Sequence, residues 1–210
     1  MELLKEHFSM YENTEDHICF CTFKRLFEEI EARGCPPLTI LETGTAYAGT
    51  KSTYLFDSYV KKYGGHFWSV DICGNTCDEA RKNVSSSSTI VCDDSVHFLE
   101  TWVKEHPGQK ADVVYLDSFD LEWDNPFPAA DHGLKEYFAI LPALGKGSLL
   151  LIDDTPNTCD ELLEADHKMF LQVKKSEQKC NKRLVGKGMY IPEHCEAECL
   201  RHVYQLLYLF

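Results

Sequence analysis

Short apolar runs alternate along the chain with longer segments in which apolar residues recur every three or four positions. An unbroken apolar run of this kind is typical of a strand buried on both faces, and the longer spacing is typical of an amphipathic helix. The expected strands are residues 38–43, 66–72, 88–93, 111–117 and 147–154. The expected helices are residues 16–33, 51–64, 77–84, 95–106 and 131–144. This alternation predicts an α/β fold with a doubly wound, mostly parallel sheet and helices on both faces.

The end of the chain carries two further apolar runs, residues 186–192 and 202–210, which we interpret as strands joined by a short acidic segment. Nothing in the composition divides the 210 residues, and this length suits one domain overall. Within it we expect an N-terminal helical cap segment, residues 1–37, followed by the α/β domain, residues 38–210.

Acidic residues stand at the carboxyl ends of the expected strands. They are Glu42, Asp71, Asp93, Asp94, Asp117, Asp153 and Asp154. Ligands of an open parallel sheet bind in the crevice outside these strand ends. Helix capping explains one or two acids at such positions but fits the whole set poorly. The sequence therefore predicts a ligand site at this edge of the sheet.

The first expected strand leads into a pattern that suits a nucleoside. Residues 40–53 read as a strand, a glycine-bearing turn and a helix, and Gly44 lets the backbone approach a ligand closely. Asp71 ends the next strand, where a carboxylate can accept hydrogen bonds from both hydroxyls of a ribose. Asp94 and Ser95 follow the third strand, at a place where an adenine edge would lie.

The order of these motifs, E-x-G-T, V-D-I, C-D-D-S, L-D-S and I-D-D, resembles the class I S-adenosylmethionine (SAM)-dependent methyltransferases over residues 38–154. The resemblance implies a Rossmann-like sheet with an antiparallel last strand, whose reversed hairpin would account for residues 186–210. It also implies SAM as cofactor and residues 38–210 as the methyltransferase domain. The implied cofactor-binding residues are Glu42, Gly44 and Thr45 by the methionine part, Asp71 at the ribose, and Asp94 with Ser95 at the adenine.

Two of these segments, residues 115–120 and 150–155, resemble the metal-dependent O-methyltransferases of the catechol and macrocin types. The resemblance implies that Asp117, Asp153 and Asp154 bind one divalent ion. Three carboxylates suit Mg²⁺, which keeps some of its waters and leaves room for a substrate. The alternative is that Asp117 is an ordinary polar residue at a strand end and that the other two acids cap a helix beginning nearby.

These motifs do not identify the residue that acts as the general base. Catechol-type enzymes carry a lysine three residues after the first aspartate, where this chain has Asp120. Asp117 and His132 are therefore the candidate catalytic residues, although a histidine that opens a helix is often a cap or a surface residue. Trp123 and Phe127 lie in the long loop before that helix, either as part of a substrate pocket or as packing residues.

The composition of the chain limits the classes of partner that it is expected to bind. The net charge of −13 disfavours a nucleic-acid partner and suits a small neutral or cationic substrate. The ten cysteines form no zinc signature, and we expect them to be reduced thiols. A secretory signal and an apolar run long enough to span a membrane are absent from the sequence, so we expect a cytoplasmic protein without a membrane partner. The oligomeric state stays open, a homodimer included.

We therefore expect a SAM-dependent methyltransferase that methylates an oxygen of a small hydroxylated molecule with the help of a metal. The alternatives are a metal-independent N- or carboxyl-methyltransferase and a non-catalytic SAM-binding protein. A nicotinamide-dependent oxidoreductase is the fourth hypothesis. Residues 44–49 read G-T-A-Y-A-G and lack the second glycine of a dinucleotide-binding fingerprint.

Overall fold

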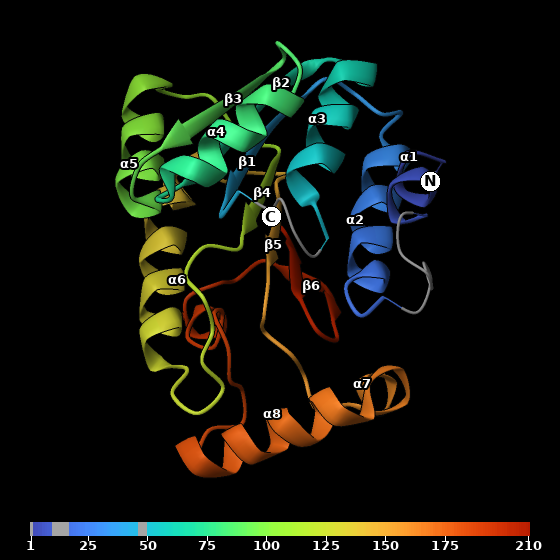
Figure 1. The fold of residues 1–210 in the computed structure, drawn as a ribbon, viewed down its shortest axis with the longest axis vertical. Helices are drawn as coiled ribbons and strands as arrows, with labels where there is room; N and C mark the ends of the chain where they lie inside the picture. The colour runs from blue at the N-terminus through green and yellow to red at the C-terminus, as the bar shows by residue number, and fades with distance from the viewer. Residues whose placement is uncertain (1, 10–16, 46–49) are drawn as a thin grey trace.

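The computed structural model describes residues 2–9, 17–45 and 50–210. Its seven strands form one mixed sheet in the order β3-β2-β1-β4-β5-β7-β6 (Figure 1). The strands are β1 Leu38–Thr43, β2 Gly65–Asp71, β3 Ser88–Cys92, β4 Val113–Leu116, β5 Leu149–Ile152, β6 Glu198–His202 and β7 Leu206–Leu209. The first five are parallel to their neighbours, whereas β7 is antiparallel to β5 and to β6. The predicted fold class, including the antiparallel last strand, is confirmed.

Helices cover both faces of this sheet. They are α1 Glu2–Phe8, α2 Phe20–Ala32, α3 Ser52–Tyr63, α4 Gly74–Asn83, α5 Ser95–Glu105, α6 Phe127–Ile140, α7 Asp160–Ala165 and α8 His167–Cys180, with short 3₁₀ turns at Leu141–Ala143 and Ile191–Glu193. Successive strand residues face opposite cores, as a period of two requires. Tyr115 joins the core under α1, α2 and α3, and Val114 joins the core under α5 and α6.

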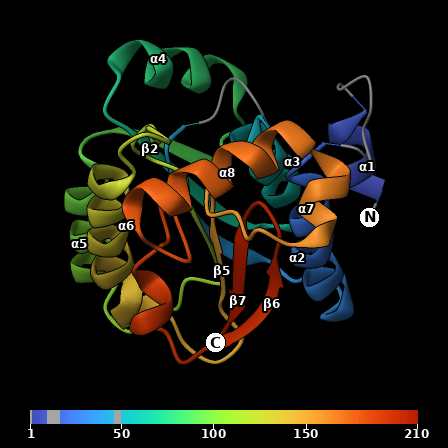
Figure 2. The ribbon, with the colours of Figure 1, turned by 90° about the horizontal axis from the view of Figure 1, so that it is seen from below.

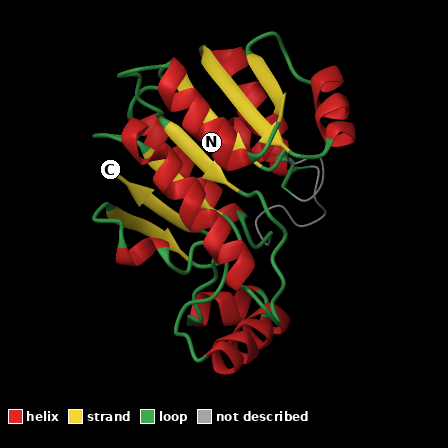
Figure 3. Cartoon of the chain, turned by 90° about the vertical axis from the view of Figure 1, so that its left-hand side faces the viewer, coloured by secondary structure: helices red, strands yellow, loops and turns green. Residues whose placement is uncertain are grey.

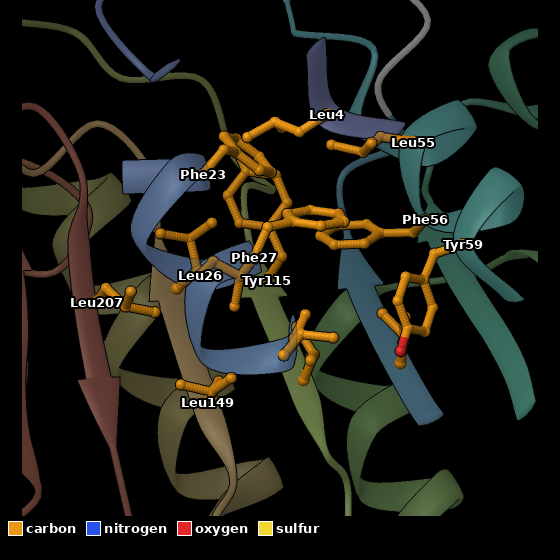
Figure 4. Close-up of a cluster of buried hydrophobic side chains, with 14 of the residues drawn as sticks. Leu4, Phe23, Leu26, Phe27, Leu55, Phe56, Tyr59, Tyr115, Leu149 and Leu207 are labelled. Carbon is orange, nitrogen blue, oxygen red and sulfur yellow. The ribbon is translucent and has the colours of Figure 1, made fainter. Parts of the chain in front are cut away.

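The N-terminal helices are part of the first core. Phe8 and Phe23 are fully buried, and the ring of Phe23 lies 5.6 Å from that of Tyr115 on β4 (Figure 4). Phe23 also packs near Phe56 of α3. The described helices α1 and α2 therefore contribute buried aromatic area to the sheet face. The expected start of the helix at residue 16 lies outside the described residues, as do residues 46–49 of the glycine-bearing turn.

The prediction of strands at residues 186–192 and 202–210 was wrong in detail. The first run forms tight turns and a 3₁₀ turn, because Lys187 N–H donates to Asp154 O at 3.1 Å rather than to a neighbouring strand. The second run contains the end of β6, a turn and β7. The hairpin of the fold is therefore β6–β7, which pairs with β5 through β7.

Two helices that we did not predict, α7 and α8, lie across one end of the sheet (Figures 2 and 3). Leu162 and Val173 of these helices form a small core with Val185 and Val203, and Trp123 packs against it. Ser176 Oγ donates a hydrogen bond of 2.7 Å to the carbonyl of Trp123. Trp123 is therefore a packing residue that fixes the loop after β4 against α8.

In the described part of the chain, none of the helices combines the length and the apolar character that crossing a bilayer requires. All ten cysteines are free thiols, as expected.

Candidate cofactor and metal site

A cavity of about 530 Å³ opens at the carboxyl ends of β1, β2 and β4 and at the start of α5. It is lined by Gly44, Val70, Asp71, Ile72, Cys73, Thr76, Asp94, Ser95, Asp117, Ser118, Phe119, Asp120 and His132. This volume lies within the range of small-molecule pockets. The fold thus brings together six of the residues that the sequence singled out: Gly44, Asp71, Asp94, Ser95, Asp117 and His132.

Gly44 forms the floor of the cavity where β1 ends. Its φ is +80°, and a Cβ at this position would lie 2.3 Å from the carbonyl oxygen of Asp117. A side chain is therefore excluded by both backbone conformation and space. The glycine lets the end of β1 lie directly against the end of β4, so Gly44 and Asp117 line the same cavity.

The carboxylate of Asp71 is fixed at the wall of the cavity by backbone groups. Its Oδ2 accepts a hydrogen bond of 3.1 Å from Thr45 N–H, and its Oδ1 accepts one of 2.7 Å from Cys73 N–H. Each carboxylate oxygen retains a further lone pair for a ligand. Thr45 thus orients Asp71 and does not itself line the cavity among the described residues.

Glu42 lies behind the cavity wall and is completely buried. Its carboxyl group accepts hydrogen bonds of 2.6 Å from each of three hydroxyl groups, those of Ser52, Thr53 and Ser69. Burial raises the pKa of Glu42 to about 7, although the three hydroxyl groups oppose the shift. Glu42 therefore ties β1 to α3 and β2, and its role in cofactor contact stays a prediction.

We expect Glu42 to make stability depend on pH. In the native state Glu42 stays protonated up to a pKa of about 7, whereas in the unfolded chain it ionises near 4.5. The native state therefore binds the extra proton between these values, and the free energy of unfolding should fall by roughly 3 kcal/mol as pH rises through this window. Urea unfolding of wild type and Glu42→Gln at pH 5 to 8 measures the effect. The wild-type curve should fall more steeply, and parallel curves would contradict the assignment.

Asp94 and Ser95 open helix α5 at the next strand end. Asp94 Oδ1 accepts a hydrogen bond of 3.0 Å from His97 N–H, so Asp94 is the N-cap of the helix. The capping alternative therefore applies to this acid. Capping uses one oxygen, and both residues still line the cavity.

His132 is connected to Ser95 across the cavity. Its Nε2 lies 2.8 Å from Ser95 Oγ and 3.6 Å from Oε1 of the buried Glu136. Ser118 Oγ donates to the same Glu136 oxygen at 2.5 Å. The hydrogen bond and charge of Glu136 raise the pKa of His132 above its usual value, and burial opposes this shift. His132 thus joins Ser95 to Glu136, and its role as a base stays a prediction.

Asp117, Asp153 and Asp154 meet at the adjacent ends of β4 and β5. One carboxylate oxygen from each residue lies within 4.8 Å of the others. The helix that follows begins only at Asp160, so Asp153 and Asp154 do not cap it. Burial first, and the charges of the other two aspartates next, raise the pKa of Asp153 well above its usual value. We call Asp117, Asp153 and Asp154 the aspartate trio.

Lys187, a cation that was not predicted from the sequence, lies at this trio. The Nζ atom of Lys187 is 2.7 Å from Asp117 Oδ1 and 3.1 Å from Asp154 Oδ2, and the lysine side chain is 7% exposed. Burial by itself lowers the pKa of Lys187, but the charges of Asp117, Asp154 and Asp153 outweigh it and raise the pKa. The only local signal was a lysine between two glycines, within a run that resembled a strand.

Three further side chains donate hydrogen bonds to the trio. Tyr115 OH donates to Asp117 Oδ2 at 3.2 Å, and Gln205 Nε2 donates to Asp153 Oδ1 at 2.6 Å. Tyr204 OH donates to Asp154 Oδ1. These donors come from β4 and from the turn between β6 and β7. The last hairpin of the fold therefore positions the trio.

The trio fits a divalent ion in its chemistry. Three carboxylates from adjacent strand ends offer the oxygen ligands that Mg²⁺ prefers, and they lie close enough to share one ion. The residues that would bind it are the three named from the sequence. Lys187 neutralises part of the same charge, so the ion and the ammonium group have the same partners.

Comparison with known proteins supports this description of the fold. No protein-family model matches the sequence, and no curated protein sequence matches it. The MycE methyltransferase of the mycinamycin biosynthetic pathway, solved with Mg, S-adenosylhomocysteine (SAH) and mycinamycin VI, superposes with a TM-score of 0.61 at 16% identity, over 98% of this chain and 54% of that one. The O-methyltransferase from Bacillus cereus, solved with SAH, has a TM-score of 0.50 at 14% identity, over 100% of this chain and 91% of that one.

At these identities the comparisons establish the fold. The chain has the fold of the class I SAM-dependent methyltransferases, which confirms the resemblance seen in the sequence. It spans about half the length of the MycE methyltransferase.

Proposed function

We propose that this protein is a SAM-dependent methyltransferase that methylates a hydroxyl oxygen of a small molecule. One observation carries the proposal: a single cavity is lined by Gly44, Asp71 and Asp94, which suit a nucleoside, and by Asp117, which belongs to the aspartate trio. Both solved neighbours described above contain SAH, and one also contains Mg. Cofactor and acidic chemistry therefore meet at the carboxyl edge of one sheet, where open α/β folds bind ligands.

The nucleoside end of the cavity has groups suited to each part of SAM. The carboxylate of Asp71, fixed by two backbone N–H groups, would accept hydrogen bonds from the ribose hydroxyls. Asp94 and Ser95 would lie at the adenine. Gly44 removes the side chain that would fill the space between these groups and Asp117. When bound, SAM supplies the electrophilic methyl group.

The chemical step needs a deprotonated hydroxyl aligned with that methyl group. Asp117 is placed to accept the hydroxyl proton, because it lines the cavity and its pKa is raised above the usual value by burial, against the opposing charge of Lys187. A divalent ion bound by the aspartate trio would supply positive charge that stabilises the deprotonated oxygen. The rest of the catalytic effect is positioning by the cavity walls. The loop after β4 lines the cavity through Ser118, Phe119 and Asp120, so it would border the substrate. The same loop is held against α8 at Trp123.

Calorimetric titration tests the proposal directly. Purified protein is titrated with SAM and SAH, with Mg²⁺ or with EDTA, beside the variant Asp153→Ala. We expect micromolar binding of both nucleosides to both proteins, since Asp153 is absent from the described cavity lining, and loss of Mg²⁺ binding in the variant. Turnover of hydroxylated small molecules should then require both Mg²⁺ and Asp153. Absence of SAM and SAH binding under every metal condition would overturn the proposal.

A metal-independent transfer has one observation in its favour. Lys187 already places a positive charge beside Asp117 and Asp154. Turnover that persists at full rate in EDTA would support this second function and leave the SAM site unchanged.

A further inference from the structure

Lys187 is fixed over the aspartate trio by its backbone as well as by its charge. Its N–H donates to the carbonyl oxygen of Asp154 at 3.1 Å. The preceding Gly186 has a φ of +119°, and a Cβ there would lie 1.9 Å from the same carbonyl oxygen. The segment therefore lies directly on the end of β5. Lys187 is built into the site and is not a surface side chain that folds over it.

The ammonium group of Lys187 shares its partners with the ion that the trio would bind. Both carboxylate oxygens of Asp117 have a donor, Lys187 and Tyr115, and both oxygens of Asp154 have one, Lys187 and Tyr204. A phenol is a neutral donor whose proton can rotate away from an arriving cation. A buried ammonium group is charged, and at hydrogen-bond distance from two ligands it would repel a divalent ion strongly.

We propose that Lys187 is a tethered cation that competes with a divalent metal for Asp117 and Asp154, so that metal enters the site only by displacing the ammonium group. The inference rests on the proposed function in one respect, that the trio is the metal site. Lys187 stabilises the three clustered carboxylates while metal is absent. Its removal exposes their repulsion and frees their oxygens, so it should weaken the metal-free protein and strengthen metal binding together.

Metal titrations of two substituted proteins test the competition. Lys187→Met removes the charge and keeps the chain length, and Lys187→Arg keeps the charge. We expect Mg²⁺ and Mn²⁺ to bind Lys187→Met at least about tenfold more tightly than wild type, within the usual range of coupling between two ligands. Lys187→Arg should bind them as weakly as wild type. The exposed Lys168 on α8 provides the matched control, and Lys168→Met should leave metal affinity unchanged.

The thermal stability of the same variants provides a second test of the competition. Lys187→Met should melt below wild type in EDTA and recover most of the difference when Mn²⁺ is added, since a bound ion then replaces the missing charge. SAH is titrated into every variant in parallel. Normal SAH binding without any metal binding to Lys187→Met would overturn the competition and leave the nucleoside site intact, whereas loss of SAH binding in wild type would overturn the proposed function itself.

A measurement on the unmodified protein covers the case in which Lys187→Met does not fold. In protein labelled with ¹⁵N-lysine, the buried ammonium group should give a slowly exchanging proton signal, which is assigned by its absence from Lys187→Arg. We expect Mg²⁺ to remove or shift this signal with the same midpoint as its binding isotherm. A signal that stays unchanged while Mg²⁺ binds would show that ion and ammonium group occupy separate places, and would refute the inference.

Discussion

Replacing Asp117 by asparagine is expected to lower the rate of methyl transfer at least about a thousandfold, within the range for loss of a base together with an electrostatic contact. Asp117 is the residue at which the two halves of the site meet. It lines the cavity, accepts a hydrogen bond of 2.7 Å from Lys187 and belongs to the trio. Asparagine keeps the size of the side chain, but it loses the charge and the ability to take a proton.

The affinity for SAM should change much less than the rate, because the contacts proposed for the nucleoside come from other strands. Single-turnover rates and SAH titrations on the same preparation separate the two quantities. Lys187 loses part of its compensating charge in this variant, so its folding must be checked by urea unfolding; a cost of about 3 kcal/mol is expected for breaking a buried ion pair.

Asp124→Asn is the matched control for this experiment. Asp124 lies in the loop after the same strand, but its side chain is 75% exposed and its ion pair with Lys179 is on the surface. Its substitution should leave both rate and affinity near those of wild type. A rate for Asp117→Asn within a few fold of wild type would remove Asp117 from the chemistry and direct attention to His132.

The part of the site built from strand ends could be predicted because it depends on topology. Parallel strands bring their carboxyl ends to one edge, so Asp71, Asp94, Asp117 and Asp153 had to lie near one another once the alternation of strands and helices was recognised. The apolar runs also predicted β1, β4 and β5 to within a few residues, since these three strands are buried on both faces. The apolar runs locate the strands along the chain, and the parallel sheet then brings the acidic strand ends to one edge.

The remainder of the site depends on contacts between segments that are distant in sequence. Lys187 reaches Asp117 across 70 positions, and Gln205 reaches Asp153 across 52. The run that contains Lys187 holds three successive apolar residues, Met189, Tyr190 and Ile191, but its glycines place it in a turn against Asp154, where hydrogen bonds to the end of β5 replace strand pairing. A short apolar run does not distinguish a strand from such a turn, so the position of Lys187 at the aspartate trio could not be predicted from the sequence.

The contact of Glu42 with a cofactor was inferred from its place in a motif and stays a prediction, whereas its observed hydrogen bonds join neighbouring elements of the fold. Glu42 lies near the end of β1, where the motif requires it. Its side chain, however, accepts hydrogen bonds from Ser52, Thr53 and Ser69, behind the wall of the cavity. A motif gives the position of a residue along the backbone. Which side of the strand end its side chain occupies follows from the packing of α3 on the sheet.

Replacing Asp71 by alanine is expected to lower the affinity for SAH about a hundredfold. Two hydrogen bonds from ribose hydroxyls to a carboxylate contribute about 1.5 kcal/mol each, and their sum of about 3 kcal/mol corresponds to this factor. Asp93→Asn is the control, because Asp93 follows the neighbouring strand β3, is absent from the described cavity lining and is hydrogen-bonded to the exposed His97. Calorimetry on the three proteins gives the affinities.

Asp71 also accepts hydrogen bonds from the backbone N–H groups of Thr45 and Cys73, so its removal could weaken binding by loosening the cavity wall. A second ligand separates these causes. If Asp71 binds the ribose, SAH should lose far more affinity on Asp71→Ala than 2′-deoxy-SAH, which lacks one of the two hydroxyls and has less to lose. Equal losses for the two ligands would mean that Asp71 does not contact the 2′-hydroxyl. A larger loss for SAH would establish contact between this carboxylate and the 2′-hydroxyl, because no change in the wall distinguishes two ligands that differ by that one group.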